Sequence, residues 1–238
     1  LLGLIILSLM LIPQVFAREG HMTLLAVQQT DDGLKGSTAD VYMEIEPGND
    51  RVFLDTFPLT KLDTQISTRF AKEISCNYFE LDCSNYDFTY TIRSGSSIIG
   101  GPSAGAALSV LTTAVLKDLD LNKNIAITGT INSGGLVGPV GGLKEKIVAA
   151  SSADIKTVLI PQGSRFQKDE NNLTLDLKDF AKKYNLTIIE VTDINDAIYY
   201  FTNKTLKKEE IDLVENKEYT KIMNETSNFL CNRTKEIK

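Results

Sequence analysis

The order of strand-like and helix-like segments limits the possible folds of this chain more than any other feature of its sequence. Three runs rich in Val, Leu and Tyr follow one another without a helical segment between them, and later runs of both kinds mix irregularly. Strand-like patterns cover residues 23–28, 40–45, 51–55, 86–93, 124–128, 157–160 and 187–191, and helical patterns cover residues 59–78, 103–119, 143–153 and 194–201. Because parallel α/β folds require repeated strand–helix–strand units, this order predicts an α+β domain.

Two segments carry more detailed predictions. Residues 59–78 are predicted to form an amphipathic helix, whose apolar positions are Leu62, Ile66, Phe70, Ile74 and Tyr78. Residues 132–142 contain several glycines, and they predict a hairpin with tight turns.

The first 17 residues differ from the rest of the chain. The stretch LLGLIILSLMLIPQVFA carries no charge, and the first charged residue is Arg18. Its length lies between the core of a signal peptide and a full membrane span, and Ala17 suits a signal peptidase. A buried helix at the edge of a domain is the alternative. We therefore expect residues 1–17 to be a signal peptide or a membrane anchor, and the remainder to be membrane-anchored or secreted, outside the cytoplasm.

Sequons and cysteines agree weakly with export. Five asparagines begin Asn-X-Ser/Thr triplets, which a sequence rich in Asn and Thr also produces by chance: Asn172, Asn185, Asn203, Asn224 and Asn232. Cys76 and Cys83 are close enough in sequence to bridge the end of a helix to the following strand in an oxidising compartment. Buried free thiols remain the alternative for this pair.

Charge and histidine content exclude several classes of function. The formal net charge is −6 and the Lys and Arg residues form no basic cluster, so a nucleic-acid partner is not expected. The single histidine, His21, cannot supply a histidine-based triad or a histidine-rich metal site. We predict neither a metal nor an organic cofactor. If the chain performs covalent catalysis, its general base is a residue other than histidine.

The first candidate cluster for catalysis is SGSSIIGGPSAG, residues 94–105. It would place Ser103 after a strand and a glycine-rich bend, at the start of a helix. The first N–H groups of a helix lack intrahelical partners and carry partial positive charge, so they could stabilise an oxyanion formed by attack of Ser103 on a carbonyl. A serine that only caps the helix fits the same pattern.

The second cluster is ITGTINSGGLVGPVGGLKEK, residues 127–146, which leads into a helix with Lys144 and Lys146. A lysine can replace histidine as a base only when it is neutral, and its pKa must fall from about 10.4 to roughly 7–8. Burial lowers a lysine pKa in this way. The helical periodicity does not decide which of the two lysines is buried.

Taken together, three motifs resemble the active-site signature of Lon proteases: GPSAG at residues 101–105, Thr128-Gly129, and GPVGGLKEK at residues 138–146. Lys146 follows Ser103 by 43 residues, which is the spacing of that family and selects Lys146 over Lys144. The resemblance covers residues 23–203 and implies the Lon proteolytic-domain fold. It also implies a serine endopeptidase that acts on unfolded or flexible polypeptides through an acyl-enzyme.

The resemblance assigns roles to individual residues. Ser103 is the nucleophile, Lys146 the general base, and Thr128 the residue that holds the lysine. Three neighbours of the serine would support it, and an extended stretch before them would pair with the substrate as an added strand. The supporting residues are Gly101, Pro102 and Ala104, and the substrate-binding strand is Ser96, Ser97, Ile98 and Ile99. The family commonly forms hexameric rings, so self-association is expected.

Departures from the family pattern point to one of its branches. Gly100 stands where many members have an acidic residue, and Thr130 where many have Glu. Together with VGPVGG, these features resemble Lon-like proteins that lack an ATPase and carry a membrane or signal segment. No Walker A sequence occurs in the 238 residues, so we expect no ATPase of its own. The expected division is residues 18–203 for the proteolytic domain and 204–238 for a charged helical tail.

Two other functions fit parts of the sequence. The stretch GGPSAGAA, residues 100–107, is also similar to the phosphate loop of small-molecule kinases, although those enzymes do not require GPVGGLKEK. A scaffold or binding protein that kept the protease fold and lost activity is the other alternative, since fold alone does not give function.

Overall fold

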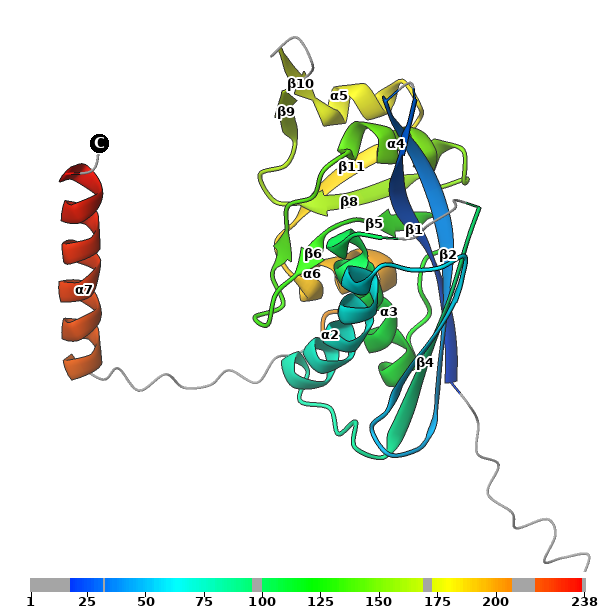
Figure 1. Cartoon of the computed structure of the whole chain (residues 1–238), viewed down its shortest axis with the longest axis horizontal. Coiled ribbons are helices and arrows are strands. Elements are labelled where there is room, and N and C mark those ends of the chain that lie inside the picture. The colour runs from blue at the N-terminus through cyan, green and yellow to red at the C-terminus, as the bar shows by residue number, and fades with distance from the viewer. Residues whose placement is uncertain (1–17, 32, 96–99, 169–172, 207–216, 237–238) are drawn as a thin grey trace, which may run out of the picture. The chain divides into compact units, whose positions relative to one another are not determined.

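The computed structural model describes residues 18–31, 33–95, 100–168, 173–206 and 217–236. The chain divides into two units, one up to Leu206 and one from Lys207 onward (Figure 1). Residues 1–17 lie outside the described part, so the predicted leader stays a prediction. Within the described ranges, no helix combines the length and the apolar character that a membrane span needs.

A four-stranded sheet forms one side of the first unit, with its strands in the order β1-β2-β4-β3. The strands are β1 (Arg18–Thr30), β2 (Gly33–Pro47), β3 (Val52–Phe57) and β4 (Tyr86–Ser94). The β1–β2 and β2–β4 pairs are antiparallel, whereas β3 runs parallel to β4. Along β2, side chains from Ala39 to Ile45 alternate between buried and accessible, as expected for a strand with one face on the core. The strands predicted at 23–28 and 40–45 are parts of this longer hairpin.

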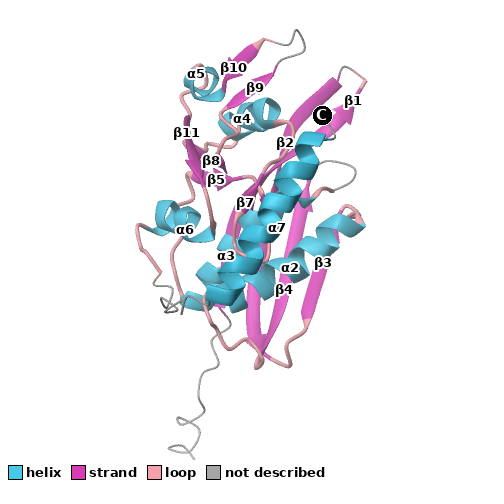
Figure 2. Ribbon diagram, turned by 90° about the vertical axis from the view of Figure 1, so that its left-hand side faces the viewer, coloured by secondary structure: helices cyan, strands magenta, loops and turns pink. Residues whose placement is uncertain are grey.

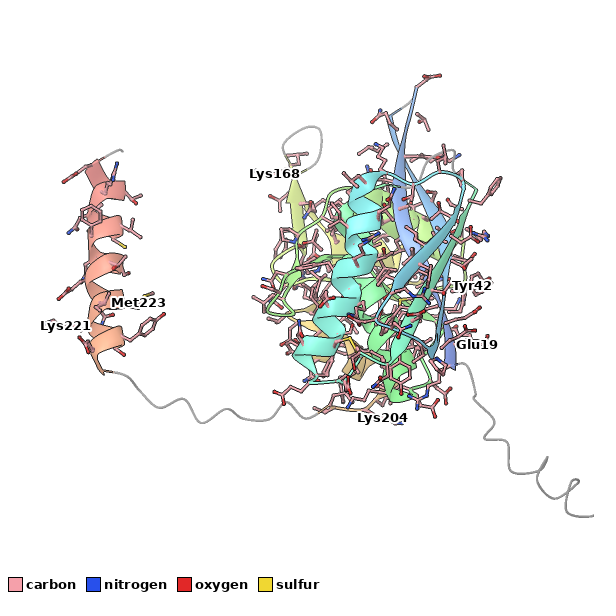
Figure 3. The ribbon with its side chains drawn as sticks, turned by 60° about the horizontal axis from the view of Figure 1, so that its bottom comes forward. Glu19, Tyr42, Lys168, Lys204, Lys221 and Met223 are labelled. Atoms are coloured by element: carbon pink, nitrogen blue, oxygen red, sulfur yellow. A yellow bond between two sulfur atoms is a disulfide. The ribbon has the colours of Figure 1, made fainter. Side chains whose placement is uncertain are left out.

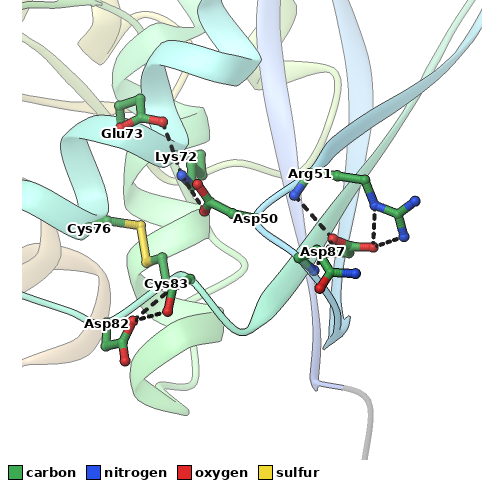
Figure 4. Close-up of polar contacts among 10 residues, drawn as sticks. Asp50, Arg51, Lys72, Glu73, Cys76, Asp82, Cys83 and Asp87 are labelled. Carbon is green, nitrogen blue, oxygen red and sulfur yellow. Dashed lines mark hydrogen bonds and ion pairs between the residues drawn. A yellow bond between two sulfur atoms is a disulfide. The ribbon is translucent and has the colours of Figure 1, made fainter.

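Two helices, α2 (Leu62–Tyr78) and α3 (Gly105–Lys117), pack together beside this sheet (Figure 2). Every residue of α3 from Gly105 to Val115 is buried, so α3 is an interior helix. The disulfide between Cys76 and Cys83 joins the end of α2 to the segment before β4 (Figure 4).

The apolar positions of α2 do not form its buried face as an amphipathic pattern requires. Ile74 is buried, but Leu62 and Ile66 are 68% and 56% exposed. The face toward α3 carries small and polar side chains instead, and Ser75 Oγ donates to the Ser109 carbonyl at 3.0 Å. Small residues let the two helix backbones approach closely, which hydrophobic periodicity does not reveal.

The first unit contains a second, smaller sheet of three parallel strands, in the order β11-β8-β5. The helices α4 and α5 pack against one another near its strands (Figure 1). Two short antiparallel pairs, β6–β7 and β9–β10, complete the strands. The bounds are β5 (Ile125–Ile127), β6 (Thr130–Ile131), β7 (Val137–Gly138), α4 (Leu143–Ser151), β8 (Thr157–Pro161), β9 (Phe166–Lys168), β10 (Thr174–Asp176), α5 (Leu177–Lys182), β11 (Thr187–Val191) and α6 (Ile194–Thr202).

This mixture of an antiparallel-rich sheet, a parallel sheet and flanking helices confirms the predicted α+β class. Buried apolar side chains form two separate groups. One includes residues of the larger sheet, α3, α6 and the smaller sheet, and the other lies between α4, α5 and the smaller sheet. The second unit contains α7 (Lys217–Glu236), in the segment where a charged helical tail was predicted. Its packing partner stays a prediction.

Candidate active site

Ser103 lies in a single 3₁₀ turn, η1 (Pro102–Ala104), which leads directly into α3. The turn is preceded by Gly101, whose φ of +103° lies in a region that residues with a side chain rarely adopt. Pro102 at the first position fixes a helical φ and has no N–H to satisfy. Ser103 itself is partly exposed. The sequence therefore places a serine on a sharp, accessible turn at the start of a buried helix.

The backbone of this turn is bonded to the segment that follows β5. The Ser103 carbonyl accepts hydrogen bonds from Gly129 N at 3.0 Å and from Thr128 Oγ1 at 3.4 Å. Ala106 N donates to the Gly129 carbonyl at 3.0 Å. Gly129 must be a glycine here, because an added Cβ would lie 2.4 Å from Val137 Cγ1. The two glycine-rich clusters of the sequence are thus neighbours in space.

Lys146 lies in the first turn of α4, and only 1% of its surface is exposed. The β1–β2 hairpin packs tightly on this helix, since a Cβ added at Gly36 would lie 2.0 Å from the carbonyl oxygen of Glu145. Burial lowers the pKa of Lys146 to about 8. None of the ion pairs among the described residues involves Lys146. Lys144, two residues earlier, is exposed, so the structure distinguishes the two lysines.

Thr128 connects the lysine to the serine turn. It is fully buried just after β5, and its N–H donates to the Leu159 carbonyl at 3.1 Å. Its hydroxyl accepts a hydrogen bond from Lys146 Nζ at 3.0 Å and donates to the Ser103 carbonyl. Among the described residues, no hydrogen bond joins Ser103 Oγ to Lys146 Nζ directly. Thr128 therefore links the amine of Lys146 to the backbone of the serine turn.

The remaining predicted site residues divide into two groups. Gly101, Pro102 and Ala104 flank Ser103 in the turn, as described above. The predicted substrate-binding residues Ser96, Ser97, Ile98 and Ile99 lie outside the described residues.

Sequence reasoning missed Asp63, in the first turn of α2. Its Oδ2 accepts a hydrogen bond from Gly101 N at 2.9 Å. Asp63 precedes Gly101 by 38 residues and belongs to a different element. An acidic residue in a first helical turn is common for reasons of the helix dipole alone, so the sequence contains no signal for this contact.

Away from the serine turn, the described residues form a large cavity but no cluster suited to a metal ion. No group of three or more His, Cys, Asp or Glu side chains in the described ranges could hold a metal ion. A cavity of about 950 Å³ opens at the other end of α3, and its lining includes Glu19 and Tyr42 (Figure 3). It contains neither Ser103 nor Lys146.

Comparisons with known proteins agree with this geometry. The sequence model of the family described as the Lon protease (S16) C-terminal proteolytic domain matches residues 69–202. The Lon protease of Campylobacter jejuni is 34% identical over 116 residues, which cover 49% of this chain and 14% of that protein. The Lon protease of Rickettsia typhi is 39% identical over 116 residues, with 48% and 14% covered. The Lon protease of Helicobacter pylori strain J99 is 34% identical over 113 residues, with 48% and 13% covered. The matched region spans about one seventh of the length of these curated relatives.

Proposed function

This chain belongs to the Lon protease (S16) C-terminal proteolytic domain family, and from that premise we propose that it is a serine peptidase with Ser103 as nucleophile and Lys146 as general base. The observation that carries the proposal is a buried lysine that has no counter-ion among the residues that the structure describes. Lys146 is 1% exposed, and its Nζ is hydrogen-bonded to the neutral hydroxyl of Thr128. Because nothing in this contact supplies negative charge, burial favours the neutral amine that a general base requires.

The reaction begins when neutral Lys146 Nζ takes the proton of Ser103 Oγ. Oγ then bonds to the carbonyl carbon of the scissile peptide, and the carbonyl electrons move to its oxygen. When the tetrahedral intermediate collapses, the C–N bond breaks and the ammonium of Lys146 returns the proton to the leaving amine. Water then attacks the carbonyl carbon of the resulting Ser103 ester, with Lys146 Nζ accepting its proton. The ester bond breaks, the ammonium of Lys146 returns the proton to Ser103 Oγ, and the acid is released.

The start of α3 can stabilise the oxyanion. The N–H groups of Gly105 and Ala106 are already bonded, to the carbonyls of Pro102 and Gly129 respectively. The N–H of Ser103, on the residue that attacks the carbonyl, is our candidate for an oxyanion donor. The positive end of the α3 dipole acts in the same direction.

Several features of the proposed function go beyond the site. We propose that the substrate is an unfolded or flexible polypeptide, that residues 96–99 pair with it, and that hydrolysis by this chain does not require ATP. We further propose self-association and an extracytoplasmic location set by residues 1–17. The absence of a Walker A sequence from the 238 residues supports the proposal that this chain needs no ATP, and the apolar composition of residues 1–17 supports the proposed location.

Hydrolysis of casein by this chain without ATP tests the proposal. We expect wild type to cleave casein, and both Ser103→Ala and Lys146→Ala to lose the activity. Lys144→Ala is the matched control, since it removes an exposed lysine two residues away on the same helix and should leave the rate unchanged. A folded wild type that leaves casein intact would contradict the proposal and favour a scaffold that lost activity.

A further inference from the structure

We propose that Asp63 positions the nucleophile by fixing the Gly101 peptide, a role that rests on the proposed function of Ser103. The two residues between Gly101 and the catalytic oxygen are Pro102 and Ser103 itself, so the orientation of the Gly101 peptide is transmitted directly to the serine turn. Asp63 would be a positioning residue, since its described contacts are with the turn and with its own helix.

The carboxylate of Asp63 is held by both of its oxygens. Oδ2 accepts the Gly101 N–H at 2.9 Å. Oδ1 accepts the N–H of Thr64 at 2.7 Å, and the hydroxyl of Thr64 lies 3.4 Å from the same oxygen. Thr64 is buried, so this end of the side chain is fixed by the interior of the protein. The other oxygen is thereby aimed at the glycine, and a hydrogen bond to a charged acceptor is stronger than one between neutral groups.

The first turn of α2 contacts the loop at a second point. Lys61, which precedes α2, lies against Gly100, where an added Cβ would be 2.7 Å from Lys61 Cδ. Ser67 Oγ donates to the Asp63 carbonyl at 2.9 Å, which ties the turn to the next turn of the helix. The positions of Gly100 and Gly101 in the loop are therefore both restrained by the start of α2.

These contacts matter because Gly100 and Gly101 give the loop great conformational freedom. A glycine at φ +103° is free to leave this conformation unless other contacts hold it. On the far side of the serine, the Ser103 carbonyl is already bound by Thr128 and Gly129. Asp63 restrains the backbone before Ser103, as Thr128 and Gly129 restrain the backbone after it. Its loss should misplace Oγ relative to Lys146 without removing any group that binds the rest of a polypeptide.

Kinetics of Asp63→Ala, Asp63→Asn and Asp176→Ala in the 238-residue chain test the proposal, using a fluorogenic peptide derived from a casein cleavage site. We expect Asp63→Ala to lower kcat by about 10- to 100-fold with KM nearly unchanged. Asp63→Asn keeps an oxygen that accepts the Gly101 N–H, so it should recover most of the rate. Asp176 accepts the N–H of Lys178 at the start of α5, away from the serine turn. Asp176→Ala therefore controls for the loss of a helix-start carboxylate, and it should leave kcat unchanged.

Amide hydrogen exchange at Gly101, measured by NMR, reports the contact independently of catalysis. We expect exchange to be at least about tenfold faster in Asp63→Ala than in wild type, with Asp63→Asn between them. An active wild type whose kcat survives Asp63→Ala, or whose Gly101 amide exchanges equally fast in both proteins, would overturn the positioning role alone. A wild type without peptidase activity would overturn the proposed function instead.

Discussion

Lys72 on α2 and Lys146 on α4 are nearly equally buried, at 4% and 1% exposure, but they lie in opposite electrostatic surroundings. Lys72 Nζ forms ion pairs with Asp50 and Glu73 (Figure 4). It also lies over the ring of Phe88. Burial works against its charge, yet the hydrogen bonds and charges of the two carboxylates outweigh burial and raise the pKa of Lys72. Lys146 has the hydroxyl of Thr128 in place of the carboxylates, and burial lowers its pKa to about 8.

The difference shows that burial alone does not make a lysine a base. Carboxylates that accompany the side chain into the interior favour its charged form, whereas a hydroxyl alone leaves burial to lower its pKa toward the range where a base operates. Lys72 therefore has a structural role in joining α2 to the turn before β3. Lys146 has the protonation behaviour that the proposed reaction needs.

The largest expected effect is the loss of activity on replacing Lys146 by Met. We expect the peptidase rate to fall by at least about 10³-fold, because Met cannot accept the proton of Ser103 as the proposed base does. The free energy of unfolding at pH 7 should rise by about 1–3 kcal/mol, since an apolar side chain of similar length removes the cost of burying an unpaired charge. Peptide hydrolysis and thermal unfolding check the two parts.

Lys72→Met is the matched control for that prediction. Its carboxylate partners are partly exposed, so we expect a loss of stability of only about 1 kcal/mol, with the peptidase rate unchanged. If Lys72→Met abolished activity while Lys146→Met retained it, the roles assigned to the two lysines would be reversed.

Thr128→Asp should convert the surroundings of Lys146 into those of Lys72. A carboxylate at this position would face the ammonium and favour its charged form, so the lysine pKa should rise. We expect the rate at pH 8 to fall about 100-fold and to recover in part at higher pH. Thr128→Asn is the neutral control. An Asn variant that lost activity as completely as the Asp variant would show that packing, and not charge, is responsible.

The stability of the wild type should depend on pH through Lys146. Its pKa is about 8 in the folded chain and about 10.5 when unfolded, so between these values the unfolded chain binds more protons. The free energy of unfolding should therefore rise with pH over this window, by at most about 3 kcal/mol. The quantity to measure is the difference in the free energy of unfolding between wild type and Lys146→Met. A difference that stays constant from pH 7 to pH 10.5 would contradict the lowered pKa.

The smallest expected effect belongs to Thr128→Val. This variant removes the acceptor for the Lys146 ammonium, so the lysine pKa should fall further and the acid limb of the pH–rate profile should move to lower pH. The optimal rate should fall only about tenfold, because the amine loses its orientation but remains neutral. An acid limb that moved to higher pH would show that Thr128 does not stabilise the ammonium.

The fold class could be predicted from the sequence because the order of its local patterns determines it, whereas the candidate site residues were assigned by resemblance to a family. The irregular order of strand-like and helical segments predicted the α+β class. The resemblance to Lon proteases, through the 43-residue spacing from Ser103, selected Lys146 where helical periodicity left Lys144 equally possible. The structure adds what depends on contacts between distant segments. The exposed Leu62 and the buried polar face of α2 depend on how closely α3 approaches, and the contact of Asp63 with Gly101 joins two elements that no local pattern connects. The short β9–β10 pair and α5 carried too weak a pattern to be predicted.

The protonation state of Lys146 is the central claim, and NMR titration of the chain labelled with 13C at lysine Cε measures it most directly. The resonance of Lys146 is assigned by its disappearance in Lys146→Met. We predict that it titrates near pH 8, while the Lys72 resonance, assigned in the same way, stays in the charged form beyond pH 10.5. A Lys146 resonance that also stays charged beyond pH 10.5 would contradict a lysine general base at this site.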